Sequence, residues 1–212
     1  IKTNYNLGFE LEYKPFNTLT LELEPSWSTT LDRMQYVTRK TLSAEPQENR
    51  YIFGTINQKI YSVSIRVDYN ITPDLTIQYW GQPFYGSGSY REFKKITEYH
   101  AGSMDDRYEI LESGHLSYAI KDRIYSIDED LDSSVDYTFG NPDFTMSEFL
   151  HNFVIRWEFL PGSTAFLVWS QNREYYTGSG VFNVSRQSHD LFHETKPYNI
   201  FLIKFSYRFG LR

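Results

Sequence analysis

The feature that most constrains this chain is a strict alternation of apolar and polar residues that recurs along the sequence. Between Tyr5 and Tyr13 every odd position is apolar and every even position is Asn, Gly or Glu. A period of two matches a β-strand, whose successive side chains point to opposite faces, and does not match a helix. A short turn and a second alternating stretch from Leu19 follow, which predicts a β-hairpin. We expect strands near residues 3–13, 18–38, 51–69, 74–85, 147–159, 164–175 and 197–209.

Short turns alternate with long polar connections between these strands. Pro15, Pro73 and Pro161 each lie in a tight turn, where the fixed φ of proline is useful and its missing N–H does no harm. The connections at the opposite ends are longer, and we expect residues 86–143 to form one long external loop. Short turns at one end and long loops at the other are typical of outer-membrane β-barrels.

Composition supports membrane-spanning strands and excludes several classes of protein. The 212 residues include 16 Phe, 18 Tyr and 4 Trp but no Cys, which excludes disulfides and thiolate metal sites. A net charge of −6 argues against nucleic acid as a partner. Apolar runs such as 165–169 are far shorter than the roughly 20 residues of a transmembrane helix, whereas a transmembrane strand needs only about 9–11 alternating residues. Aromatic residues cluster near both strand ends, which predicts two interfacial girdles.

The predicted fold is therefore all-β, an antiparallel transmembrane β-barrel of the outer-membrane type, in a single domain over residues 1–212. The strand count is odd, whereas such barrels usually have an even number of strands. The start of the chain has no signal-peptide pattern. We expect the chain to be the C-terminal part of a larger barrel. A soluble β-sandwich remains the alternative, because a half-buried antiparallel sheet shows the same alternation.

In these strands the charged residues lie on the face opposite to the apolar residues. Arg66 and Asp68, and likewise Arg156 and Glu158, are two residues apart and therefore share a face of their strand. We expect them to form ion pairs along the barrel interior. Since both signs are present, a charge-selective ring is less favoured.

One acidic run is a candidate calcium site. Asp128, Asp130 and Asp132 occupy the first, third and fifth positions of an EF-hand-like loop. Ser133 replaces the Gly of that motif, and Phe139 replaces its bidentate Glu. Three carboxylates at alternate positions could still supply oxygen ligands for calcium, and a solvated acidic loop is the alternative reading.

His189 and His193 are four residues apart, so both lie on one face of either a helix or a strand. They could bind zinc, or they could be two surface histidines in a loop. The chain has no Gly-x-Ser-x-Gly elbow, and Ser179 lies in a short Gly-Ser-Gly loop tip. We therefore predict no catalytic residues and no cofactor other than calcium.

Three strings carry a resemblance to a known family: TPDLTIQYWGQPF at residues 72–84, RWEFLPGST with VWSQ at 156–164 and 168–171, and FLIKFSYRF at 201–209. Together they resemble a large Bacteroidota family of uncharacterised outer-membrane proteins. Full-length members carry a signal peptide and a family-nine-like carbohydrate-binding domain before a domain of unknown function. The resemblance implies that this chain is the C-terminal part of that barrel-like domain, with a link to carbohydrate handling. It carries over no functional residue.

The sequence thus predicts a channel, a receptor or a subunit of a surface complex in the outer membrane of a Gram-negative bacterium. Its expected partners are outer-membrane lipid, other outer-membrane or periplasmic proteins, and glycan. One alternative is a soluble β-sandwich that binds carbohydrate. A second alternative is an outer-membrane enzyme whose site lies on the loops, with His189, His193 and Ser179 as its candidate residues.

Overall fold

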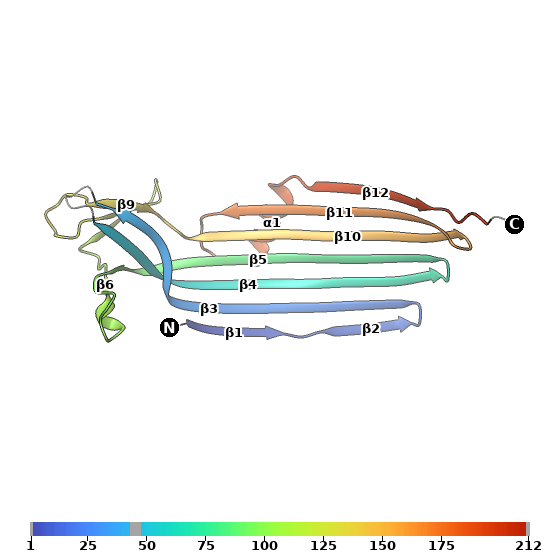
Figure 1. Ribbon diagram of the computed structural model, residues 1–212, viewed down its shortest axis with the longest axis horizontal. Coiled ribbons are helices and arrows are strands. Elements are labelled where there is room, and N and C mark those ends of the chain that lie inside the picture. The colour runs from blue at the N-terminus through green and yellow to red at the C-terminus, as the bar shows by residue number, and fades with distance from the viewer. Residues whose placement is uncertain (1, 43–47, 211–212) are drawn as a thin grey trace.

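The computed structural model describes residues 2–42 and 48–210, and these form mainly antiparallel β-structure (Figure 1). The large sheet has the order β1 (Lys2–Gly8), β3 (Leu19–Thr41), β4 (Asn49–Thr72), β5 (Leu75–Ile96), β10 (Phe144–Leu160), β11 (Ser163–Thr177) and β12 (Tyr198–Ser206). Two short strands are added to it: β2 (Leu11–Phe16) pairs with β3, and β6 (Tyr108–Ile110) pairs with β5. Within the described residues the sheet is open, with β1 and β2 at one edge and β12 at the other.

The two ends of the large sheet differ in how the strands are connected and in how far they extend. Short turns join β2 to β3, β4 to β5 and β10 to β11 at one end, which we call the turn end. At the other end, which we call the loop end, β3, β4 and β5 extend well past β10 and β11 (Figure 1). The strand predicted at 3–13 is interrupted at residues 9 and 10, so that β1 and β2 follow each other along β3.

Residues 86–143 do not form the single long loop that their Gly, Ser and charged residues predict. Strand β5 continues to Ile96, and η1 (Asp105–Arg107) and β6 follow it. A separate sheet of β7 (Leu116–Ala119), β8 (Ile124–Ile127) and β9 (Tyr137–Gly140) then forms. Glycine is suited to this part of β5, because a Cβ at Gly88 would collide with the ring of Phe144 on the neighbouring β10.

The buried core lies at the loop end, where the small sheet packs against the extended strands. Its members come from β4, β5, β8, β9 and the residue after β6: Ile52, Phe93, Leu111, Ile127, Tyr137 and Phe139. Burying large side chains such as these is the main source of packing stability in a domain. The large sheet nearer the turn end contributes no residue to this cluster.

The register of the sheet separates one apolar face from one polar face. One row of directly paired residues on the apolar face crosses all the long strands: Tyr13, Leu21, Val67, Tyr79, Phe153, Trp169 and Phe201. The adjacent row, on the opposite face, contains Glu12, Glu22, Arg66, Trp80, Asn152, Ser170 and Ile200. The alternation seen in each strand is therefore in phase across the sheet.

The segment that contains His189 and His193 is a helix, α1 (Val184–His193), where the sequence predicts a loop. The side chain of Asn183 caps it by accepting a hydrogen bond from the Arg186 amide. Only Gln187 and Leu191 are buried on the helix. Few apolar residues mark its inner face, which is why the periodicity of the sequence does not reveal it.

Helix α1 covers the apolar face of the large sheet towards the loop end. Gln187 donates from Nε2 to the Gly86 carbonyl of β5 and to Ser147 Oγ of β10, both at 3.3 Å. Phe182, just before the helix, packs edge-on against Trp27 of β3 with ring centroids 5.1 Å apart. The segment around α1 thus crosses several strands at one level. Among residues 2–42 and 48–210, no helix is long and apolar enough to cross a membrane.

Gln187 is predicted to fix α1 to the sheet. Gln187→Ala removes its hydrogen bonds to the carbonyls of Gly86 and Met146 and to Ser147 Oγ, so helix docking should weaken by about 1–2 kcal/mol. Hydrogen exchange should become faster in α1 while the β5 and β10 amides near the turn end keep their protection. Ser185→Ala, at an exposed position of the same helix, is the control. Equal protection in both variants would contradict this role.

Candidate functional site

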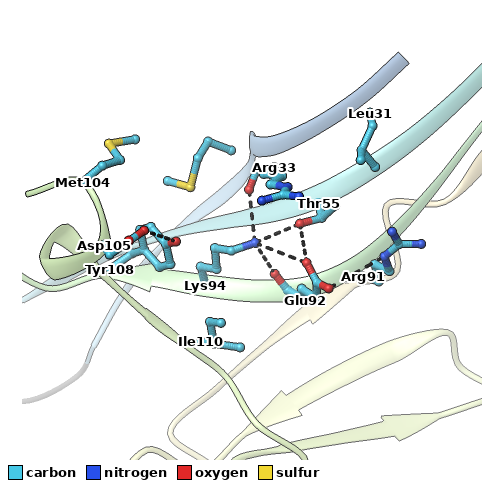
Figure 2. A pocket seen from close by; sticks show the side chains of 11 residues that line it. Leu31, Arg33, Thr55, Arg91, Glu92, Lys94, Met104, Asp105, Tyr108 and Ile110 are labelled. Atoms are coloured by element: carbon cyan, nitrogen blue, oxygen red, sulfur yellow. Dashed lines mark hydrogen bonds and ion pairs between the residues drawn. The ribbon is translucent and has the colours of Figure 1, made fainter. Parts of the chain in front are cut away.

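A hollow lined by charged residues lies at the loop end, between the extended strands and the segment of η1 and β6 (Figure 2). We call it the Lys94 pocket, and its volume is about 510 Å³. Its polar lining is Arg33, Thr55, Arg91, Glu92, Lys94, Asp105 and Tyr108, and its apolar lining is Leu31, Met34, Met104 and Ile110. The volume is in the range of small-molecule sites.

Lys94 is an almost completely buried charged residue of this pocket, with 3% of its surface exposed. Its ammonium group donates to the carbonyls of Arg33 at 3.1 Å and Glu92 at 3.0 Å, and to Thr55 Oγ1 at 2.9 Å. These acceptors lie on β3, β4 and β5, so one side chain links three strands (Figure 2). Burial lowers the pKa of Lys94, and the nearby Glu92 carboxylate opposes that effect. All three N–H bonds of the ammonium are used, which suits a structural cross-link.

A β-bulge at Glu92 creates the shape of the pocket. The pairing of β4 with β5 shifts between Phe53 and Thr55, because β5 carries one extra residue there. Glu92 has φ +50°, a left-handed conformation that costs energy for a residue other than glycine. Its carboxylate accepts from Thr55 Oγ1 at 2.8 Å and lies 4.0 Å from Lys94 Nζ. The bulge thereby places opposite charges side by side in the pocket floor.

Two guanidinium groups complete the pocket chemistry. Arg91 Nε lies 3.9 Å from the Glu92 carboxylate and is largely exposed. Within residues 2–42 and 48–210, the Arg33 side chain makes no hydrogen bond or ion pair. Cationic groups beside methionine and leucine side chains can bind a small ligand that has an anionic end and an apolar body. Thr55 Oγ1 donates to the Glu92 carboxylate and accepts from Lys94, but Thr55 has only 2% of its surface exposed, so its hydroxyl serves the cross-link and is not presented to a ligand as a nucleophile.

A second charged cluster, centred on Glu129, joins the small sheet to the long strands. Glu129 accepts from Arg50 Nε at 3.0 Å and from the Tyr137 hydroxyl at 2.8 Å, and Lys95 Nζ lies 3.4 Å away. Burial alone would raise the pKa of Glu129, but the hydrogen bonds from Tyr137 and Arg50 and the charge of Lys95 lower it overall. Burial and the adjacent Glu129 carboxylate also raise the pKa of the Tyr137 hydroxyl. The carboxylate is therefore ionised and held in place at neutral pH.

The structure brings together two of the three residues predicted to bind calcium. Carboxylate oxygens of Asp128, Asp130 and Asp136 lie within 4.8 Å of one another. Asp132 is outside this group, and its carboxylate accepts hydrogen bonds from the amide and hydroxyl of Ser134. Asp136 replaces it because the hairpin of β8 and β9 returns the chain to Asp128, a contact that residue spacing in the sequence does not show. Asp128 Oδ1 is buried and has no partner among the described residues.

The histidines and Ser179 do not form a catalytic arrangement. His189 and His193 are both exposed on α1, and the only side-chain contacts of Ser179 Oγ within the described residues are to Thr145 Oγ1 at 2.8 Å and to the Val181 amide. No hydrogen bond joins Ser179 to either histidine in that part of the chain. The residues proposed for a loop-borne enzyme site therefore remain separate.

The polar face of the large sheet carries ion pairs, as predicted, although one partner differs. Arg156 Nη2 lies 3.0 Å from Glu158. Arg66 pairs across to Glu22 on β3 at 3.4 Å, and Asp68 accepts instead from Gln78 on β5 at 2.8 Å. Cross-strand neighbours compete with residues two apart, because directly paired side chains are closer.

The long antiparallel sheet with a separate small sheet defines an all-β protein with unusually long strands. The family model "Domain of unknown function (DUF5916)" matches residues 1–209, so the chain belongs to that family. No curated protein and no solved structure matches the chain.

Glu129 is predicted to hold the small sheet in place in a pH-dependent way. Because its pKa is lowered in the folded protein, its stabilising contribution is complete above its usual pKa of 4.5 and is lost as pH falls through the lower folded value. At neutral pH, Glu129→Gln should destabilise this region by about 1–3 kcal/mol. Hydrogen exchange of β7, β8 and β9 should become faster in the variant. Lowering the pH should then destabilise the small sheet less in the variant than in the unchanged protein.

The matched control is Glu48→Gln, because Glu48 also pairs with Arg50, at 2.7 Å, but is 55% exposed. It should change exchange in the small sheet little. An equal effect of both substitutions would show that the Glu129 contacts do not anchor the sheet.

Proposed function

We propose that this chain forms part of the wall of an outer-membrane β-barrel, with its loop end outside a Gram-negative cell. The observation that carries the proposal is the continuous apolar belt on one face of the large sheet. A second row, closer to the turn end, is apolar on every strand that it crosses: Phe16, Leu19, Tyr69, Ile77, Ile155, Leu167 and Ile203. Such rows suit a surface that faces lipid.

On β5 the height of this belt matches a bilayer, whereas on β10, β11 and β12 the belt is lower, because His151, Gln171 and Asn199 form the row beside Gly81. On β5 it runs from Leu75 beside the turn to Tyr85, where α1 begins to cover the sheet. About ten residues at ~3.3 Å each, tilted by roughly 40°, span about 25 Å, which is the height of the apolar band in outer-membrane barrels. Beyond Tyr85 the next positions on the same face of β5 are polar, namely Ser87 and Ser89. The strands therefore extend past the belt on the side of the long connections.

The exposure of the belt is too great for a soluble surface. Leu7, Phe201, Ile203 and Phe205 have 71%, 68%, 65% and 72% of their surfaces exposed. Soluble proteins rarely leave large contiguous apolar patches in water. A soluble β-sandwich would need a second layer over this face, and within the described residues only the α1 segment lies on it, towards the loop end. This argues for the barrel over the sandwich.

The open edges support a barrel larger than this chain. Every residue of β1 and β12 is exposed, and unpaired backbone groups are not tolerated in lipid. In the proposed barrel, further strands complete the ring, and this chain supplies its C-terminal part. Resemblance to the Bacteroidota outer-membrane family is in accord with this placement.

At the cell surface, the proposed role is that of a receptor, a channel or a subunit of a complex. The Lys94 pocket favours the receptor, because it offers charged and apolar groups for a small ligand on the outer side of the belt. Glycan as that ligand, and partner proteins in the outer membrane or periplasm, rest on the family resemblance. The Thr55 hydroxyl, which pairs with the Glu92 carboxylate, is buried and also bound by Lys94, which disfavours an enzyme.

Calcium is a second proposal, favoured by the grouping of Asp128, Asp130 and Asp136. Oxygen atoms that ligate one calcium ion lie about 2.3–2.6 Å from it, and the spacing of these three carboxylates allows that. Asp128 Oδ1, which is buried without a partner, would serve as one ligand. Calcium there would strengthen the hairpin of β8 and β9 by relieving repulsion among the carboxylates.

The barrel proposal predicts which tryptophans contact lipid. Trp157 lies on the apolar face, and Trp80 lies on the polar face of the neighbouring strand. In vesicles, brominated acyl chains should quench the fluorescence of a variant that keeps only Trp157 and should leave a variant that keeps only Trp80 almost unquenched. Protein that is fully soluble without detergent or lipid, or equal quenching of both tryptophans, would refute the proposal.

The calcium proposal predicts an ion bound with a dissociation constant on the order of 0.1–1 mM, as in extracellular calcium modules. Calcium should slow hydrogen exchange between residues 128 and 136. Asp128→Asn should abolish this effect, whereas Asp132→Asn, outside the cluster, should largely preserve it. Calcium that gives no protection, or an equal loss in both variants, would contradict the assignment.

A further inference from the structure

The exposed face of α1 carries two histidines in an arrangement that the barrel proposal does not use. His189 and His193 are one helical turn apart, and their rings stack with centroids 4.2 Å apart and planes inclined by 8°. The side chain of His189 is 62% exposed, and His193 is also exposed. Neither residue is among the buried residues of α1, which are Gln187 and Leu191.

Hydrogen bonding fixes which nitrogen each ring presents to solvent. His193 Nδ1 lies 2.9 Å from the backbone carbonyl of His189. A carbonyl can only accept, so this Nδ1 carries the proton and Nε2 keeps its lone pair. His189 Nδ1 lies 3.5 Å from the Asp190 carboxylate, which favours the same tautomer. Both rings therefore keep a lone pair on Nε2.

This is the arrangement in which proteins hold a metal-binding histidine. A ligating imidazole usually donates its other N–H to a carboxylate or a backbone carbonyl, which orients the ring and raises its basicity. Here His193 has a backbone carbonyl as its partner, and His189 has a carboxylate. Two nitrogen ligands at metal distances of about 2.0–2.1 Å lie roughly 3 Å apart, with their lone pairs converging on the ion. The two rings lie nearly parallel with centroids 4.2 Å apart, so binding one ion requires these exposed side chains to turn about their χ angles until both Nε2 atoms reach it.

We propose that His189 and His193 form a two-histidine site for a divalent transition-metal ion on the outer surface of α1. Imidazole nitrogen favours copper, nickel and zinc over calcium or magnesium, and copper should bind more tightly than zinc. With two ligands from the protein, the ion keeps open positions for water or for an anionic ligand from outside. The site depends only on the geometry of α1, so it stands whether or not the sheet lies in a membrane.

The test is titration of the folded, detergent-solubilised protein with copper and zinc, followed by calorimetry. We expect one ion of either metal per chain, with copper the tighter. His189→Gln and His193→Gln should each weaken binding by at least about tenfold, and Asp190→Asn by about tenfold through loss of the orienting partner. His100→Gln removes another exposed histidine, one that packs at a tilt against Tyr99, and should leave binding unchanged.

Electron paramagnetic resonance of the copper complex distinguishes this site from nonspecific binding. Two imidazole nitrogens should couple to the copper, and one should remain after either substitution. Hydrogen exchange of α1 without metal should match among the variants, which checks that the helix is intact. Binding that is unaltered by both histidine substitutions, or a single coupled nitrogen in the unchanged protein, would overturn the proposal.

Discussion

The structure depends on a register that stays in phase across the large sheet. In an antiparallel sheet, a slip of one residue would move every side chain of a strand to the opposite face. From β2 to β12 the rows of paired residues instead keep one parity, so Tyr13 and Phe201 at the two edges lie on the same face as Val67 and Phe153 between them. The apolar belt follows from this register, because alternation within single strands would not align by itself.

At the loop end the register of the sheet shifts, and these shifts produce the buried core and the Lys94 pocket. The pairing of β3 with β4 shifts between Asp32 and Gln35, and that of β4 with β5 shifts near Glu92. After such a bulge the two faces exchange parity, so Phe93 enters the buried core while the adjacent Lys94 joins three strands beneath the pocket. The regular part of the sheet suits contact with lipid, and the irregular part can enclose a core and a ligand.

Sequence patterns predicted the regular part and missed contacts between distant segments. Alternation located the strands around Tyr61 to Tyr69 and Phe201 to Phe205, because each strand carries its own signal. The continuation of β5 was missed, since Gly86 and Gly88 are typical of turns yet here allow close packing against β10. Asp136 and Lys94 were missed as site residues for a similar reason. Asp136 meets Asp128 only when the hairpin of β8 and β9 closes, and Arg33, whose carbonyl binds Lys94, comes from another strand.

The two edges of the sheet differ in a way that bears on how a barrel would close. On β3 the polar-face positions are Thr20, Glu22 and Glu24, whereas on β12 Tyr198, Ile200 and Leu202 occupy that face and are exposed by 50–70%. In the proposed barrel an apolar inner face beside β12 would be unfavourable next to water, so an apolar element would have to cover it. Closure therefore requires more than a strand that pairs with the backbone of β12. The completing part must also bring apolar side chains to the inner face there, while the β3 side can remain hydrated.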